Sequence, residues 1–229
     1  MFRIFNKLNN EIEGLFRVWA RMSIRRAGVW FVDIPRTSST SVKMELGSHF
    51  GGEYLKSFER ETGIKRKKYF HDHCPAVTIK QALRDTVWNE IFTFSIVRNP
   101  WDRFLSLYRF RIALGDLPKD VEFNQYVKML MDVRYRRQDS PYFASHYHMS
   151  MCDFLMDSRD QILVNRVYRM EERGEMISEL GTRLGFNLHE THKEQLSNGK
   201  SYRDYYDDES AELIAKHYSD DISYFKYRF

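Results

Sequence analysis

Two segments of the chain share one pattern, in which a strand-like apolar run breaks into a polar loop and then into a helix. Residues 29–34 lead into the loop PRTSSTS (residues 35–41), and residues 92–97 lead into RNP (residues 98–100). Helix N-termini carry unpaired N–H groups and a partial positive charge, which suit phosphate or sulfate. Because parallel strands present their carboxyl ends at one edge of a sheet, the two loops predict a site for a ligand with anionic groups at two ends.

The two loops together resemble those of the sulfotransferases that use 3′-phosphoadenosine-5′-phosphosulfate (PAPS). In that family a loop reading roughly Pro-Lys-Thr-Gly-Gly/Ser-Thr-Ser grips the 5′-phosphosulfate. A second loop, Arg-Asn/Asp-Pro with a serine eight residues after the arginine, holds the 3′-phosphate. Arg98 and Ser106 have that spacing. The resemblance therefore implies a set of donor-binding residues: Arg36, Thr37, Ser38, Ser39, Thr40, Ser41, Arg98, Ser106, Ser197 and Lys200.

The carboxyl-terminal part of the chain adds a third match. Residues 197–206 (SNGKSYRDYY) and 220–227 (DDISYFKY) resemble the ending of the carbohydrate branch, the Golgi-type and bacterial family 2-like enzymes. Lys200 matches a loop that contacts the 3′-phosphate, although a solvated lysine fits the sequence equally well. Lys43 is a further cationic candidate. The resemblance spans about residues 29–227 and implies an enzyme that transfers the sulfuryl group of PAPS to a hydroxyl group.

The first loop departs from the family pattern at three positions. Arg36 replaces the usual lysine, and Ser38 and Ser39 stand where glycine is common. Arginine keeps the positive charge and can bind two oxygens at once, but it is bulkier than lysine. Serine restricts the backbone conformations that glycine permits. We expect the loop to keep its phosphosulfate role with an altered geometry, and Arg36 to stabilise the departing phosphate during catalysis.

A histidine pair lies between the two loops, in the segment HDHCPA (residues 71–76). It resembles the His-x-Pro-Ala or His-x-His segment of carbohydrate sulfotransferases, in which a histidine is the catalytic base. A histidine titrates near neutral pH and suits the task of taking the proton of an acceptor hydroxyl. The match to Pro75 favours His73 as the base and His71 as the second candidate. In an extended segment both side chains would share one face.

Three other interpretations compete with this one. The pairs His71/His73 and His146/His148 are compatible with a zinc site, but no cysteine pair supports it, so we expect no metal. A nucleotide kinase requires Gly-x-x-x-x-Gly-Lys-Ser/Thr, which the chain lacks. A non-catalytic nucleotide-binding relative would keep the fold. Retention of Arg98, Ser106 and His73 argues against that last interpretation.

Composition narrows the class of protein. The 229 residues suffice for one sizeable hydrophobic core and are few for two full domains. The net charge of +4 suits an anionic donor and does not imply nucleic-acid binding. Cys74 and Cys152 cannot form a disulfide framework. No apolar run approaches the roughly 20 residues that span a bilayer, and the amino end lacks a signal peptide's apolar stretch. We therefore expect a cytoplasmic enzyme without stable membrane insertion.

Hydrophobic periodicity predicts strands that alternate with helices. Together with the resemblance to the sulfotransferases, this implies an α/β fold: a single P-loop-like domain, residues 1–229, with a central parallel sheet flanked by helices. An N-terminal helix lies within residues 1–28, and residues 117–157 are expected to form an acceptor-side cap. Asn99 and Asp207 are expected to be helix N-caps. The strands are predicted at 29–34, 92–97 and 161–170, and the main helices at 40–48, 82–89, from 100, 123–132, 175–184 and 208–218.

The identity of the acceptor is not encoded in any motif. The resemblance to the carbohydrate branch favours a sugar hydroxyl. A phenol, a tyrosine side chain or a small metabolite would use the same in-line chemistry, and the aromatic residues of the predicted cap suit sugar stacking and phenol packing alike. The oligomeric state is left open.

Overall fold

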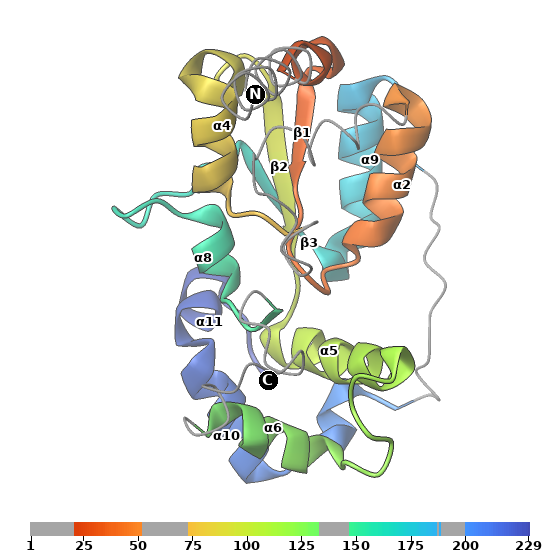
Figure 1. Cartoon of the computed structure of the whole chain (residues 1–229), viewed down its shortest axis with the longest axis vertical. Helices are drawn as coiled ribbons and strands as arrows, with labels where there is room; N and C mark the ends of the chain where they lie inside the picture. Colours follow the sequence, from red (N-terminus) through yellow and green to blue (C-terminus); the bar gives the residue numbers. More distant parts are fainter. Residues whose placement is uncertain (1–20, 52–72, 133–146, 187, 189–199) are drawn as a thin grey trace, which may run out of the picture. The chain divides into compact units, whose positions relative to one another are not determined.

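The computed structural model describes residues 21–51, 73–132, 147–186, 188 and 200–229 (Figure 1). Three strands are found in these residues, in the sheet order β1-β2-β3. The contacts divide the described chain into two compact units. The first takes its residues from 1–33, 39–95 and 155–167, and the second from 34–38, 96–154 and 168–229. Strands β2 and β3 continue from one unit into the other.

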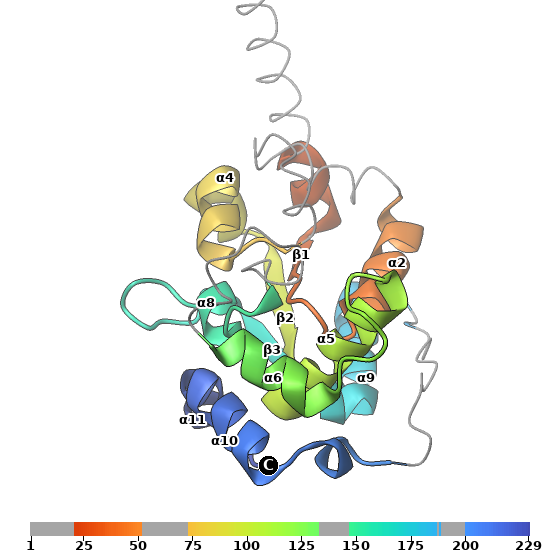
Figure 2. The same ribbon diagram turned by 60° about the horizontal axis from the view of Figure 1, so that its bottom comes forward.

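The first unit is built on two parallel strands. β1 (Val29–Val32) pairs with β2 (Phe92–Val97) in the register Val29↔Phe92 to Val32↔Ser95. β1 is apolar and buried throughout, and β2 is buried from Thr93 to Val97, as expected of a parallel sheet covered on both sides. Helices α2 (Ser39–Phe50) and α4 (Ala76–Trp88) flank this pair on opposite sides in Figures 1 and 2. The predicted α/β class with a parallel sheet is therefore confirmed.

Helix α5 (Pro100–Leu114) is the centre of the second unit. It packs against α6 (Phe123–Met131) and α10 (Asp208–His217), which also pack against each other. The chain then continues into α11 (Ser219–Phe225), and this C-terminal segment is drawn in blue in Figure 2. The two aromatic residues of α6, Phe123 and Tyr126, are buried. The described part of the predicted acceptor-side cap therefore includes a helix whose aromatic side chains belong to the hydrophobic core.

The start of α5 follows the sequence closely. The Asn99 side chain accepts a hydrogen bond from the Trp101 amide at 3.1 Å, and Pro100 occupies the first helical position. Two further bonds join this turn to the C-terminal part of the chain. The indole of Trp101 donates to the Ala211 carbonyl at 2.9 Å, and the Tyr206 hydroxyl donates to the Trp101 carbonyl at 2.8 Å. The turn before α5 is thus held by its own cap and by hydrogen bonds with the C-terminal part of the chain.

Other elements differ from the prediction in length. β3 (Arg166–Arg169) is shorter than predicted. Just before it, the Asn165 side chain accepts bonds from both the amide and the hydroxyl of Thr93, and the Asn165 amide donates to the Thr93 carbonyl at 2.9 Å. Helix α4 begins at Ala76 and contains a kink at Arg84. α11 was not anticipated. Of the predicted N-terminal helix, only residues 21–28 lie among the described residues, and 21–27 are helical.

The remaining elements are short or close to their predicted bounds. α8 (Met151–Leu155) begins with two amides, of Met151 and Cys152, that donate to the buried Asp221 carboxylate at 2.8 Å each. α9 (Arg173–Leu184) ends at Gly185 in the left-handed conformation, and Asp207 caps α10 as predicted. The 3₁₀ helices are η3 (Met170–Glu172) and η4 (Tyr202–Tyr205).

A membrane-spanning helix would need a long apolar stretch, and none of the helices in the described residues has one.

Candidate active site

The first loop, Ile34–Ser38, lies in the second unit and has a strained backbone. Arg36 and Ser38 adopt φ angles of 67° and 69°, in the left-handed region that disfavours residues with a Cβ atom. Thr37 lies between them, is fully buried, and its hydroxyl donates to the Ile34 carbonyl at 3.0 Å. Thr37 therefore closes the loop on itself, and strain of this kind is found where a structure holds a binding loop in one conformation.

A buried arginine of α5 stabilises this loop through hydrogen bonds. Arg103 donates to the Pro35 carbonyl and to the Met149 carbonyl at 3.0 Å each, and it is only 3 % exposed. Arg103 lies on the face of α5 away from the apolar stripe that Trp101, Phe104, Leu105, Tyr108 and Ile112 form. The structure packs that face against the loop, so a charged side chain there is structural. Arg103 is thus a positioning residue that the helix pattern did not reveal.

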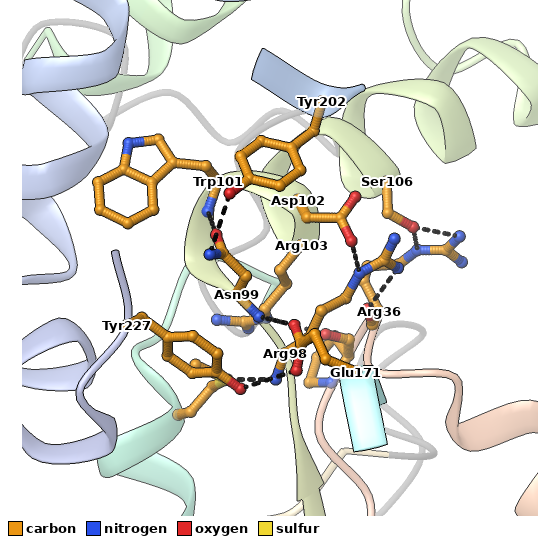
Figure 3. A network of polar contacts seen from close by, with 12 residues as sticks. Arg36, Arg98, Asn99, Trp101, Asp102, Arg103, Ser106, Glu171, Tyr202 and Tyr227 are labelled. Carbon is orange, nitrogen blue, oxygen red and sulfur yellow. Dashed lines mark hydrogen bonds and ion pairs between the residues drawn. The ribbon is translucent and has the colours of Figure 1, made fainter. Parts of the chain in front are cut away.

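The structure brings the two predicted loops together through Arg36 and Ser106. The guanidinium of Arg36 donates to Ser106 Oγ through Nε at 3.2 Å and through Nη2 at 3.0 Å (Figure 3). Its carbon Cζ lies 4.4 Å from the centre of the Phe110 ring. Burial, together with the nearby Arg98 cation, lowers the pKa of Arg36 to about 10. Arg36 is still protonated at neutral pH and can bind an anion.

Arg98 is the second cation of this cluster. Its Nε donates to Asp102 Oδ2 at 2.8 Å, one turn along α5, and its Nη1 donates to the Arg36 carbonyl at 3.2 Å (Figure 3). The Arg98 side chain is 15 % exposed. It is therefore held by a carboxylate and by the first loop at once. A phosphate that bound Arg98 would share it with Asp102.

Glu171 stabilises the turn between β2 and α5, and no sequence signal pointed to it. One carboxylate oxygen accepts from the Asn99 amide at 2.6 Å, and the other accepts from the Tyr227 hydroxyl at 3.2 Å (Figure 3). The Asn99 side-chain amide donates to the Arg228 carbonyl at 2.9 Å and to the Tyr202 hydroxyl at 3.3 Å. The C-terminal segment that resembles the carbohydrate branch therefore contacts the RNP turn directly.

Ser38 has a partner at the start of α9. Arg173, which is 9 % exposed, donates from Nη1 to Ser38 Oγ at 3.3 Å. Ser38 stands where the family commonly has glycine, and its φ of 69° is a conformation that glycine adopts without cost. The serine therefore combines an unfavourable backbone with one additional hydrogen bond.

This conflict yields a prediction about stability. Ser38→Ala keeps the strained backbone and loses the bond to Arg173, whereas Ser38→Gly loses the same bond and relieves the strain. We expect the glycine variant to have a free energy of unfolding about 1 kcal/mol higher than the alanine variant, measured by urea denaturation. Equal stability of the two variants would show that the left-handed conformation costs nothing here.

Asp33, Lys43 and His73 form a cluster of charges in the first unit. Lys43 Nζ lies 2.6 Å, and His73 Nδ1 3.2 Å, from Oδ2 of Asp33, whose side chain is 3 % exposed. Burial alone would raise the pKa of the Asp33 carboxyl. The neighbouring His73 and Lys43 outweigh that effect and hold the pKa below its ordinary value. Asp33 is therefore ionised at neutral pH, and the ring of His73 lies against a carboxylate.

The remaining candidates occupy different places. Ser39, Thr40 and Ser41 form the first turn of α2, which contains no acidic residue, and the N-terminal end of a helix suits an anion. Lys200 is exposed, just before η4. His71 and Ser197 lie outside the described residues. Among those residues, no group of three or more metal-ligating side chains is found.

The two clusters differ in the chemistry that they can perform. In the second unit, two guanidinium groups and a hydroxyl converge, and charge-assisted bonds from such groups suit phosphate or sulfate oxygens. In the first unit, a histidine is oriented by a carboxylate, which suits proton transfer. A model of the sulfotransferase family matches residues 24–228 of the chain. None of the curated proteins and none of the solved structures matches it.

Proposed function

This chain belongs to the sulfotransferase family and is a PAPS-dependent sulfotransferase, and we propose that it transfers the sulfuryl group of PAPS to a carbohydrate hydroxyl by in-line displacement. The proposal rests above all on the hydrogen-bonded cluster of Arg36, Arg98 and Ser106, which contains the cations and the hydroxyl that the family's two loops require. Two cations fit a donor with a phosphate at one end and a phosphosulfate at the other.

The residues have separate roles in this proposal. Arg98 and Ser106 bind the 3′-phosphate of the donor. Arg36, with the first-turn residues of α2, binds the 5′-phosphosulfate and stabilises the charge that develops on the departing phosphate. Sulfuryl transfer, like phosphoryl transfer, needs alignment of three atoms and stabilisation of charge more than covalent participation by the protein.

The hydrogen bonds of the cluster are compatible with binding of the donor. Ser106 Oγ accepts two bonds from Arg36, and its hydroxyl proton can be donated to an oxygen of the 3′-phosphate. Asp102 shares Arg98 with the phosphate, because a guanidinium group has five N–H donors.

The acceptor class follows from the C-terminal resemblance to the carbohydrate branch. Phenols, tyrosine side chains and small metabolites are the alternatives. Incubating the protein with PAPS and a panel containing each class, followed by intact-mass detection of an added sulfate, tests the assignment. Sulfation of sugars alone supports the proposal, and sulfation confined to another class replaces the carbohydrate assignment. Nucleotide binding without any transfer would support the non-catalytic relative.

The role of Arg98 gives a prediction about nucleotide affinity. We expect Arg98→Ala to weaken binding of 3′-phosphoadenosine-5′-phosphate by about 2 kcal/mol or more, because a charged hydrogen-bond partner of the phosphate is lost. That loss is about 30-fold in Kd, which calorimetry resolves. Arg159→Ala is the matched control, since Arg159 is a highly exposed arginine that also pairs with an aspartate, Asp157. The parent protein should bind the analogue without the 3′-phosphate much more weakly; equal affinity contradicts the assignment.

A further inference from the structure

Asp33 touches the ring of His73 with two oxygens. His73 Nδ1 lies 3.2 Å from the carboxylate oxygen Oδ2 and 3.4 Å from the backbone carbonyl oxygen of the same residue. The backbone carbonyl oxygen can only accept, and the carboxylate oxygen also accepts at neutral pH, because the pKa of the Asp33 carboxyl lies below its ordinary value. A neutral imidazole has one N–H donor and one acceptor nitrogen. The two acceptors therefore place the proton on Nδ1 and the lone pair on Nε2.

The position of Asp33 makes it a rigid support. Asp33 follows the last residue of β1, its side chain is 3 % exposed, and the His73 side chain is 15 % exposed. Along the chain, Asp33 precedes Arg36 of the first loop by three residues. A carboxylate fixed at a strand end holds an imidazole in one orientation and one tautomer, as second-sphere carboxylates do for histidines at metal sites and in catalytic triads.

Lys43 modulates this pair. Its ammonium group lies 2.6 Å from Oδ2, the carboxylate oxygen that also faces His73. Within the described residues, Asp33 from the end of β1 and Lys43 from α2 are the charged groups of this cluster that face His73. The carboxylate stabilises a protonated imidazole and the ammonium group opposes that effect.

We infer that Asp33 is a positioning residue for sulfuryl transfer, which holds His73 with its proton on Nδ1 so that Nε2 accepts the proton of the acceptor hydroxyl. During the transfer the acceptor oxygen forms a bond to sulfur, the sulfur–oxygen bond to the departing phosphate breaks, and the hydroxyl proton moves to Nε2. Asp33 stays ionised and stabilises the resulting imidazolium. This inference rests on the proposed function, because it assigns a partner to the proposed base.

The tautomer is testable in the unmodified protein. ¹⁵N NMR distinguishes a ring nitrogen that carries a proton from one that does not, and the His73 signals are assigned by their loss in His73→Gln. At a pH at which the ring is neutral, we expect the proton on Nδ1. A proton on Nε2 would overturn the positioning role. The measurement requires neither a known acceptor nor an Asp33 variant that folds.

The pH dependence of turnover supplies a second test, in which two variants should displace the pH profile in opposite directions. Asp33→Asn removes the charge that stabilises the imidazolium, so turnover should fall about tenfold and the acid side of its pH profile should move to lower pH. Lys43→Met removes the opposing charge, so its acid limb should move to higher pH. Shifts in the same direction, or no shift in either variant, contradict the inference.

A double variant separates this inference from the proposed function. If Asp33 acts through His73, Asp33→Asn should slow a His73→Ala protein no further, whereas a purely structural effect would add to the loss. Full activity of His73→Ala would refute the proposed base, and the tautomer measurement would still decide whether Asp33 orients the ring. A large loss in His73→Ala with no change in Asp33→Asn would refute the positioning role alone.

Discussion

Replacing Arg36 with alanine should lower turnover about 100-fold while the affinity for 3′-phosphoadenosine-5′-phosphate changes much less. The structure places the Arg36 guanidinium beside Ser106 and Phe110 in a half-buried cluster, where a cation that meets developing charge has a larger effect than in water. The leaving phosphate gains its negative charge only as the sulfur–oxygen bond breaks. An interaction that strengthens at that point lowers turnover when it is removed and leaves ground-state binding nearly unchanged.

Arg36→Lys is the matched control, because it keeps the charge and restores the residue that the family usually has. The lysine cannot donate two bonds to Ser106 as Arg36 does, but its ammonium group can still reach a phosphate oxygen. We expect it to retain most of the turnover or to improve it. A fully active Arg36→Ala would mean that the first loop is structural and that another group stabilises the departing phosphate.

The parts of the fold that the sequence predicted well are those determined by local physics. β2 has its predicted bounds because a six-residue run of β-branched, aromatic and small residues ends abruptly at Arg98. α5 begins where asparagine supplies an N-cap and proline supplies a preset φ angle. The cap of α10 by Asp207 was predicted for the same reason. In each case the decisive interaction lies within a few residues along the chain.

The parts that the sequence did not predict depend on distant partners. Arg103 is buried because its guanidinium satisfies carbonyls of residues 35 and 149, and helix periodicity alone assigns that face to solvent. Glu171 belongs to the site because its carboxylate bridges the Asn99 amide and the Tyr227 hydroxyl, which are far from it in sequence. Asp33 was overlooked for the same reason, since its meaning depends on His73, forty residues away.

Family spacing predicted which residues gather but not how they bond. The resemblance assigned Arg36 to the 5′ end of the donor and Ser106 to the 3′ end. The structure joins the two by a pair of hydrogen bonds. It also gives Arg98 a carboxylate partner, Asp102, within its own helix. Motif spacing indicates which residues gather. Which hydrogen bonds these residues form with one another depends on side-chain geometry, and no spacing encodes that geometry.

The largest expected loss is that of His73→Ala, which should lower turnover by about 100-fold or more, the usual scale for removing a general base. Nucleotide affinity should stay nearly unchanged, because His73 lies in the cluster with Asp33 and Lys43 and is assigned to the acceptor hydroxyl. In the parent protein the rate should fall at acid pH, where an imidazole base is protonated, and this acid limb of the pH profile should disappear in the variant. Measuring sulfated acceptor against pH checks both expectations.

His49→Ala is a suitable control, since His49 is an exposed histidine at the end of α2. It should keep both the rate and the acid limb. Hydrolysis of the donor is not an adequate substitute assay, because water does not need to be positioned as an acceptor hydroxyl does. His71→Ala should lose less than His73→Ala, because the contacts of His73 Nδ1 with Asp33 orient its ring for proton transfer. A larger loss in His71→Ala would transfer the base to that histidine, and undiminished turnover in both variants would place the base elsewhere in the chain.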